Sequence, residues 1–165
     1  MIHTKEPAIV RRMKLADNPM IANIIRTVMP EFGASGPGFA IHDPEVADMF
    51  GSYTRPRCAY FVCVMEGSVL GGAGIAPLEN GPDEVCELKK MYFLPEARGT
   101  GMGQSVLTSC LTEARNLGFR YCYLETFNTM VRAMKFYERN HFRRIPGPMG
   151  NTGHFACDTF YKLEL

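Results

Sequence analysis

The most informative part of the chain is MYFLPEARGTGMGQSVL, residues 91–107. It begins as an apolar run, passes a proline, and ends in three glycines at alternate positions, Gly99, Gly101 and Gly103. The residues after the last glycine have helical spacing, although glycine is poorly suited to begin a helix. This pattern predicts a strand, a glycine turn and a helix. The three glycines would leave the backbone of the turn uncovered by side chains, which raises the question of what the exposed backbone binds.

Such a turn has a physical use as an anion site. The first turn of a helix has unpaired N–H groups and the positive end of the helix dipole, and glycines let a phosphate approach them without interference from Cβ atoms. A nucleotide P-loop would need Lys and then Ser or Thr after the last glycine, but Gln104 and Ser105 stand there. The spacing G-x-G-x-G also differs from the dinucleotide fingerprint G-x-G-x-x-G. Judged from the turn alone, an alternative is that the glycines only permit a tight connection between the strand and the helix and bind no ligand.

Length and composition exclude several classes of protein. A chain of 165 residues with 46% hydrophobic and 21% charged residues predicts one domain over residues 1–165. The net charge of +1 gives no reason to expect a nucleic-acid partner. No apolar run approaches the roughly 20 residues of a membrane helix. Because the start, MIHTKEPAIVRRMK, is also too polar for a secretory signal, we expect a cytoplasmic protein without a membrane partner.

The six cysteines are scattered along the chain, with no C-x-x-C pair and no spacing typical of zinc sites. Several lie in apolar surroundings, where a free cysteine behaves as a small hydrophobic residue. We therefore expect free, mostly buried thiols rather than a disulfide framework.

Hydrophobic periodicity predicts strands and helices in a mixed order. A strand over residues 9–13 precedes a helix that begins at Asp17 or Asn18, and the apolar face of this helix comprises Met20, Ile21, Ile24, Ile25 and Val28. A long loop with a short helix over residues 44–50 leads to a hairpin that turns at residues 66–68. After the third strand come a helix over residues 104–117, a strand over 120–127, a helix over 130–140 and strands over 141–145 and 155–165. The predicted class is α/β (α+β).

Two motifs at a fixed separation resemble the GNAT N-acetyltransferase superfamily. The glycine stretch is similar to the family's acyl-CoA segment Q/R-x-x-G-x-G/A, with Arg98, Gly101 and Gly103 at the matching positions. Further along, LETFNTMVRAMKFYERNHF is similar to the family's A-x-x-F-Y-E-x-x-G-F, and the matching residues are Ala133, Phe136, Tyr137, Glu138 and Phe142. The resemblance implies a single domain built on a mixed, mostly antiparallel sheet of six to seven strands, flanked by helices and splayed at the acyl-CoA site.

The resemblance also implies acetyl-CoA as the cosubstrate, without a metal. Its pyrophosphate would lie on backbone N–H groups of the turn, from Arg98 or Gly99 through Thr100, Gly101, Met102 and Gly103 to Gln104. Its pantetheine arm would pair like an extra strand with the backbone of Met91, Tyr92 and Phe93. Many family members hold this arm with an asparagine at the position of Met130, so Asn128, out of register by two residues, is a candidate for that contact.

Two residues are candidates for moving protons. Tyr137 occupies the family's usual acid position and would protonate the CoA sulfur, with a core tyrosine as the alternative. Glu87 lies eleven residues before Arg98, where some family enzymes place a general base. Strand alternation predicts that Glu87, Lys89 and Met91 share one face. An ion-pair role for Glu87, with water carrying the proton, is the alternative.

Polar residues nearer the two ends of the chain are candidates for the part of the site that binds the acceptor substrate. His154 and Asp158 would share a face of an extended strand while Cys157 points away, which favours a structural or substrate-side role over a metal site. We expect the loop with His42, Asp43, Glu45 and Asp48 to line the acceptor pocket, where its acids would suit a cationic amine, or else to form a solvated helix face.

The sequence thus predicts an N-acetyltransferase that moves acetyl from acetyl-CoA to an unidentified amine by direct attack in a ternary complex. The principal alternative is a non-catalytic acyl-CoA-binding module, which would keep the glycine turn but need neither Tyr137 nor Glu87. A thiol-based redox or metal protein is a further alternative. A homodimer is common in the family and is possible for this chain.

Overall fold

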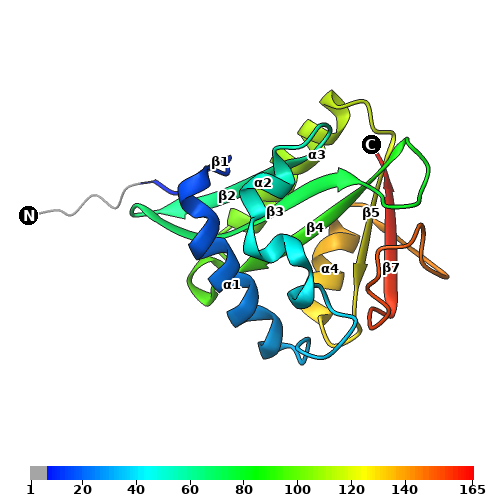
Figure 1. The fold of residues 1–165 in the computed structure, drawn as a ribbon, viewed down its shortest axis with the longest axis horizontal. Coiled ribbons are helices and arrows are strands. Elements are labelled where there is room, and N and C mark those ends of the chain that lie inside the picture. The colour runs from blue at the N-terminus through cyan, green and yellow to red at the C-terminus, as the bar shows by residue number, and fades with distance from the viewer. Residues whose placement is uncertain (1–6) are drawn as a thin grey trace, which may run out of the picture.

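One mixed sheet runs through the whole molecule (Figure 1). The computed structural model describes residues 7–165, so the first six residues of the predicted domain lie outside the described part. The sheet has seven strands in the order β1-β2-β3-β4-β5-β7-β6, and only the β4–β5 pair is parallel. The strands are β1 (Ile9–Arg12), β2 (Ala59–Met65), β3 (Ser68–Pro77), β4 (Val85–Phe93), β5 (Tyr121–Thr126), β6 (Arg143–Ile145) and β7 (Thr159–Glu164). The predicted mixed, mostly antiparallel sheet is confirmed.

Helices cover both faces of this sheet (Figure 1). The α-helices are α1 (Asn18–Glu31), α2 (Met49–Tyr53), α3 (Met102–Asn116) and α4 (Val131–Arg139). Short 3-10 helices occur at η1 (Leu15–Asp17), η2 (Ala40–His42), η3 (Pro44–Ala47) and η4 (Pro95–Ala97). The short helix predicted over residues 44–50 is therefore divided between η3 and α2. No helix in residues 7–165 combines the length and the apolar content that crossing a membrane would require.

Each face of the sheet has its own hydrophobic core. One core lies between the sheet and α3 with α4, and the buried residues of α3 in it include Val106, Leu107, Cys110, Leu111 and Ala114. The other lies between the sheet and α1 with α2. In α1 the predicted residues Ile21, Ile24, Ile25 and Val28 are buried, but Met20 is 42% exposed, so its place on the buried face was wrong. All six cysteines are free, and five of them are buried, as expected.

The β2–β3 hairpin turns where the sequence predicted. Glu66 and Gly67 both have positive φ, 50° and 75°, which is the backbone of a two-residue type I′ turn. Such a turn matches the right-handed twist of the strands it joins.

Strand β4 departs from regular alternation at one residue. Lys90 has φ of 53°, and the register with β3 shifts by one residue between the pairs Gly72–Tyr92 and Gly74–Lys89. This β-bulge turns Lys89 and Lys90 toward the same side, where both form ion pairs with Glu45. The prediction that Met91 shares the face of Glu87 and Lys89 is therefore wrong, and Met91 packs against the α3 core instead.

Strands β4 and β5 stay together only at their beginnings. Their parallel pairing runs from Val85–Tyr121 to Glu87–Tyr123 and then stops, while β4 continues to Phe93 (Figure 1). The predicted splay of the sheet is thus present, and it leaves the β5-facing edge of β4 without a strand partner after Glu87.

The last strand begins later than predicted. Thr159 is its first residue, and residues 146–158 form a loop with turns. The expected strand geometry of His154, Cys157 and Asp158 is therefore wrong. His154 and Cys157 line the same cavity, whereas the Asp158 carboxylate accepts a hydrogen bond from the Asn128 N–H at 3.0 Å.

Candidate active site

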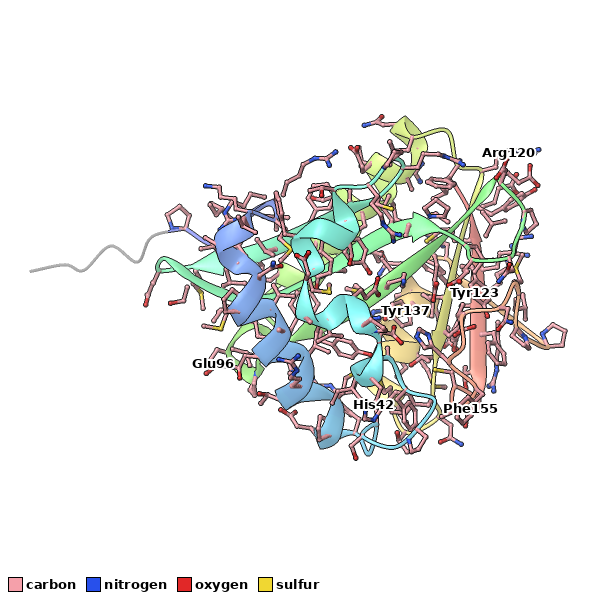
Figure 2. The ribbon with its side chains drawn as sticks, in the orientation of Figure 1. His42, Glu96, Arg120, Tyr123, Tyr137 and Phe155 are labelled. Carbon is pink, nitrogen blue, oxygen red and sulfur yellow. The ribbon has the colours of Figure 1, made fainter. Side chains whose placement is uncertain are left out.

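A cavity opens where β4 and β5 diverge. Both strands contribute to its wall, together with α4, the loop after α1 and the loop before β7. Tyr137 lies toward the middle of the molecule in Figure 2, while His42 and Phe155 mark the loops at one end. The lining residues are Met29, Phe39, Ala40, Glu87, Leu88, Lys89, Lys90, Met91, Tyr92, Leu124, Glu125, Thr126, Phe127, Met130, Tyr137, His154 and Cys157.

Glu87 is an acidic residue of this cavity that has no polar partner in the described part of the chain. Its side chain is only 4% exposed, yet within residues 7–165 it forms no hydrogen bond and no ion pair. Because no fully enclosed side-chain oxygen lacks a partner in this part of the chain, the Glu87 carboxylate has its open side toward the cavity. Burial raises the pKa of Glu87 to about 7, against the smaller opposing effect of the nearby Lys89 charge.

Tyr137 presents a hydroxyl group to the same cavity. Its ring packs edge-on against Phe136 and Phe142 and is tilted against Tyr161, which holds the side chain in place. The residue is 8% exposed, and its hydroxyl has no hydrogen-bond partner in the described chain. Burial raises the pKa of Tyr137 well above its ordinary value, so the hydroxyl carries its proton at neutral pH.

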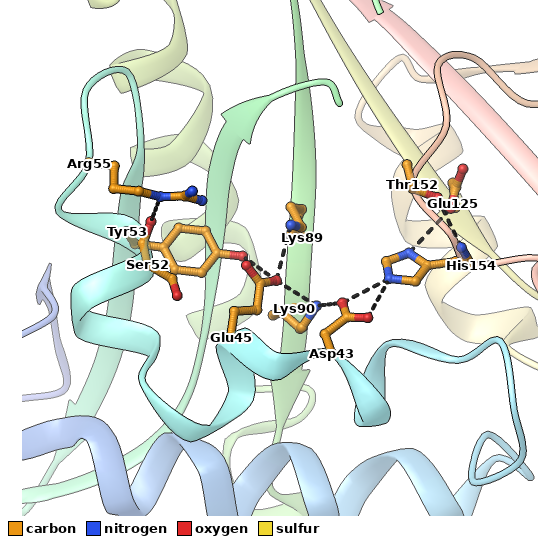
Figure 3. Close-up of polar contacts among 10 residues, drawn as sticks. All are labelled: Asp43, Glu45, Ser52, Tyr53, Arg55, Lys89, Lys90, Glu125, Thr152 and His154. Carbon is orange, nitrogen blue, oxygen red and sulfur yellow. Dashed lines mark hydrogen bonds and ion pairs between the residues drawn. The ribbon is translucent and has the colours of Figure 1, made fainter. Parts of the chain in front are cut away.

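An ion-pair network borders the cavity (Figure 3). The Asp43 carboxylate lies 2.5 Å from the Lys90 Nζ and 2.8 Å from the His154 Nε2. The Glu45 carboxylate lies 3.0 Å from the Lys89 Nζ and 2.7 Å from the Lys90 Nζ. Of the predicted loop residues, Asp43 and Glu45 therefore bind lysines beside the cavity.

The other two polar residues of that loop have separate partners. The exposed His42 ring contacts the Ser35 carbonyl at 2.8 Å. The Asp48 carboxylate accepts the Gly51 N–H at 3.0 Å and caps α2. Neither residue lines the cavity.

His154 joins two loops to the sheet. Its Nε2 meets Asp43, and its Nδ1 lies 3.4 Å from the Glu125 carboxylate on β5. Burial disfavours a charged ring, but the hydrogen bonds to Asp43 and Glu125 outweigh burial and raise the pKa of His154 to about 9. Burial acts to raise the pKa of Asp43, but the hydrogen bond to His154 and the charge of Lys90 outweigh it and hold this pKa down at about 2. Glu125 also accepts hydrogen bonds from Tyr123 at 2.8 Å and Thr152 at 2.7 Å.

Three of these groups are close enough to hold a metal ion in principle. One ligand atom from each of Glu87, Glu125 and His154 lies within 4.8 Å of the others. A metal would need a neutral imidazole nitrogen, whereas both ring nitrogens of His154 face carboxylates that favour the protonated ring. The donor set therefore fits a cationic histidine better than a metal ligand.

The glycine turn before α3 has free backbone donors. Gly99 and Gly101 have φ of 72° and 86°, and nothing lies within 4 Å of a Cβ built at either position. The N–H groups of Gly99, Thr100, Gly101, Gly103 and Gln104 donate to no acceptor in residues 7–165. They stand at and before the first turn of α3, where an anion is favoured.

Two neighbours of this turn are already engaged. The Arg98 N–H donates to the Pro95 carbonyl at 3.1 Å, so the free donors begin at Gly99. The Arg98 side chain donates to the Phe93 carbonyl and to Glu31, both at 2.9 Å. Met102 N–H lies 3.4 Å from the Thr100 hydroxyl, which is a weak contact.

The remaining predicted cofactor residues divide between two places. Met91, Tyr92 and Phe93 form the end of β4 beyond its pairing with β5. Asn128 is exposed and does not line the cavity, whereas Met130 does. The hypothesis of an Asn128 contact has no geometric support beyond its proximity in the chain.

Sequence reasoning missed the partnership of Glu125 with His154 and the bulge at Lys90. The contact between His154 and Asp43 joins residues 111 positions apart, so no local pattern could indicate it. Cys157 lines the cavity, but burial raises the pKa of its thiol to about 12, which disfavours a thiolate nucleophile.

Comparisons with known proteins agree with this geometry. Residues 21–142 match the acetyltransferase (GNAT) family. The chain is 40% identical over 158 residues, 95% of each sequence, to a protein of Escherichia coli (strain K12) named "Uncharacterized N-acetyltransferase YjgM". The fold of the present chain is similar to that of a GNAT-family acetyltransferase from Staphylococcus aureus Mu50. The TM-score is 0.84, with 18% identity over 96% of this chain and 99% of the S. aureus chain. The fold is also similar to that of the PaiA N-acetyltransferase from Thermoplasma acidophilum in complex with coenzyme A, with a TM-score of 0.75 and 13% identity over 97% and 100% of the two chains.

Proposed function

The chain belongs to the acetyltransferase (GNAT) family and is an acetyltransferase, and on this premise we propose that it moves acetyl from acetyl-CoA to an amine by direct attack within a ternary complex. The pyrophosphate of acetyl-CoA would bind the free N–H groups from Gly99 to Gln104. The pantetheine arm would pair with β4 from Met91 to Phe93, where the strand lacks β5. The thioester would then reach the cavity between these strands.

In the proposed reaction Glu87 is the general base and Tyr137 the general acid. Glu87 takes a proton from the acceptor ammonium, and the free amine attacks the thioester carbonyl carbon. As the tetrahedral intermediate collapses, the C–N bond remains, the C–S bond breaks, and the Tyr137 hydroxyl protonates the departing thiolate. The products are an N-acetylated amine and CoA. The second amine proton is lost to solvent, and the proton held by Glu87 is returned through solvent to Tyr137.

The observation that carries this proposal is the unpartnered Glu87 carboxylate at the cavity wall. Leaving a buried carboxylate without a partner is unfavourable, so a site that keeps one needs a use for it. A pKa of about 7 is also well matched to a base that works near neutral pH. A module that only bound acyl-CoA would gain nothing from this group.

The test is turnover by Glu87→Gln, measured as CoA thiol released over a panel of primary amines. We expect kcat/KM to fall roughly 100-fold or more, as for loss of a general base. Acetyl-CoA affinity, measured by calorimetry, should be unchanged. In the wild type kcat/KM should rise with pH through about 7, because only the deprotonated Glu87 accepts a proton, and the variant should lose this rise.

The matched control is Glu84→Gln. This glutamate lies just before β4, is exposed, and pairs only with Arg120 on the surface. It should keep the wild-type rate and pH profile. If Glu87→Gln also kept both, Glu87 would not be the base. Absence of turnover with every amine would remove the proposed function itself.

A further inference from the structure

The charged groups around the cavity form one network of ion pairs, with a single exception among the described residues. Lys89, Lys90 and His154 supply three cationic groups, and each lies within ion-pair distance of a carboxylate of Asp43, Glu45 or Glu125. Among the described residues, Glu87 is the carboxylate at this site that forms no ion pair, and a His154 ring nitrogen lies within 4.8 Å of it. The surplus at the site is therefore one carboxylate.

The cationic groups are also held away from a ligand by these partners. The Lys90 side chain has no exposed surface, and its Nζ touches both Asp43 and Glu45. The His154 side chain is 8% exposed and has a carboxylate at each ring nitrogen. No arginine is among the described residues that line the cavity. The Lys89 side chain is 17% exposed, and its Nζ lies 3.0 Å from the Glu45 carboxylate. Among the described lining residues, an anionic ligand would therefore meet no cation without a carboxylate partner.

Apolar side chains form another part of the cavity lining. Phe39 and Phe127 meet edge to face with ring centroids 5.1 Å apart, and Met29, Ala40 and Tyr92 lie on the same wall. Such surface suits the hydrocarbon part of an acceptor and offers it little hydrogen bonding.

We infer that the acceptor is a cationic amine whose nitrogen is carried on an apolar alkyl or arylalkyl body, without a carboxylate next to the amine. This inference rests on the proposed function, since it assigns the substrate class of the same site. The ammonium group would enter beside Glu87, the one unpaired charge, and the apolar body would contact Phe39 and Phe127. An α-amino acid would bring its carboxylate against Glu87 with no cation free to receive it, and like charges in such a place are strongly unfavourable.

The experiment compares compounds that differ only in the α-carboxylate. Tyramine and tyrosine, phenethylamine and phenylalanine, tryptamine and tryptophan, and isoamylamine and leucine form four pairs of graded size. Initial rates of CoA release give kcat/KM for each member with the wild-type protein. We expect the amine to exceed its amino acid on the order of 100-fold in every pair that turns over.

A second arm tests the cause of the preference. Asp43→Asn removes one of the two carboxylates that contact each of Lys90 and His154 and adds one net positive charge beside the cavity. In this variant the ratio of kcat/KM for the amine to kcat/KM for the amino acid should shrink at least about tenfold, because the added net positive charge can now attract the carboxylate. A merely structural loss would lower both rates and leave the ratio unchanged, which would overturn the charge argument.

The two proposals fail differently. If amino acids are acetylated as well as their amines, the inference is overturned while the acetyl transfer to amines stands. If acetyl-CoA binds but no compound of either kind is acetylated, the proposed function falls and the inference falls with it.

Discussion

At the scale of single residues, the site is unusual because two buried polar groups lack protein partners. Glu87 and Tyr137 are 4% and 8% exposed, yet neither finds a hydrogen bond within residues 7–165. A buried donor or acceptor without a partner costs about 1–3 kcal/mol. Both groups face the same cavity, so a ligand there would supply the missing partners.

Tyr137→Phe tests the tyrosine alone. The substitution keeps the ring contacts with Phe136 and Phe142 and removes only a hydroxyl that forms no hydrogen bond within residues 7–165. Stability should therefore stay within about 0.5 kcal/mol of the wild type. If the hydroxyl protonates the leaving thiolate, kcat should fall roughly 100-fold with no change in acetyl-CoA affinity. Steady-state kinetics and calorimetry measure the two quantities.

Tyr161→Phe is the matched control for that substitution. Tyr161 belongs to the same aromatic cluster, but its hydroxyl donates to Glu138 at 2.8 Å, so it is used structurally. Its variant should lose stability and keep kcat. A Tyr137→Phe enzyme with wild-type kcat would show that Tyr137 is only a core tyrosine.

At the scale of elements, the turn before α3 should bind the cofactor through backbone alone. Gly101→Ala places a Cβ in the open space in front of the free N–H groups and strains a backbone with φ of 86°. We expect acetyl-CoA affinity to fall at least about tenfold, since a Cβ hinders the approach of phosphate to the N–H groups. Calorimetric titration measures this change.

Gly118→Ala separates strain from obstruction. Gly118 ends α3 with φ of 83° and equally open space around it, but it lies at the other end of the helix. Both alanine variants should lose similar stability, about 1 kcal/mol. Only Gly101→Ala should weaken acetyl-CoA binding, and equal binding by both variants would contradict the anion site.

The turn after α4 contains a non-glycine residue with a left-handed backbone. His141 occupies the position where the family pattern has glycine, and its φ is 69°. The side chain is exposed, so His141→Gly removes little contact while it relieves the left-handed backbone. The variant should be more stable by about 1 kcal/mol, as judged from urea denaturation. An equal or lower stability would show that the histidine side chain contributes a contact of its own.

These elements also show what a sequence can predict. The hairpin at Glu66 and Gly67 and the glycine turn before α3 have local signals, because turn chemistry is set by adjacent residues. The bulge at Lys90 has none, since one extra residue leaves composition and hydrophobicity unchanged while it reverses the alternation after it. Glu87 could be proposed as a general base from its offset to Arg98. That Glu87 forms no ion pair could not be predicted, because the nearby cations pair with Asp43, Glu45 and Glu125, which lie far from it in the sequence.

At the scale of the whole molecule, the site depends on segments brought together from opposite ends of the chain. The loop after α1 supplies Asp43, the loop before β7 supplies His154, and β5 supplies Glu125. Figure 3 shows His154 between the two carboxylates. Among the described residues, His154 is the one that forms ion pairs both with the loop after α1 and with β5. It therefore holds the two loops against the sheet at one wall of the cavity.

His154→Gln should loosen this wall in a way that depends on pH. The pKa of His154 is raised from 6.5 to about 9 on folding, so its charge stabilises the fold fully below pH 6.5. That stabilisation is lost as pH rises through about 9. We expect the variant to be less stable than the wild type by about 2 kcal/mol at acid to neutral pH, and the difference to vanish in alkaline solution. Urea denaturation across this pH range measures it.

Hydrogen–deuterium exchange shows where the stability is lost. In His154→Gln, residues 33–48 and 146–158 should exchange faster, because the charged link between the two loops is gone, while β2 and β3 should be unchanged. His42→Gln is the control, since His42 is exposed and contacts only the Ser35 carbonyl. A stability difference that is the same at every pH would mean that His154 acts through packing, and uniform exchange over both loops and strands would mean that the two loops do not form one wall.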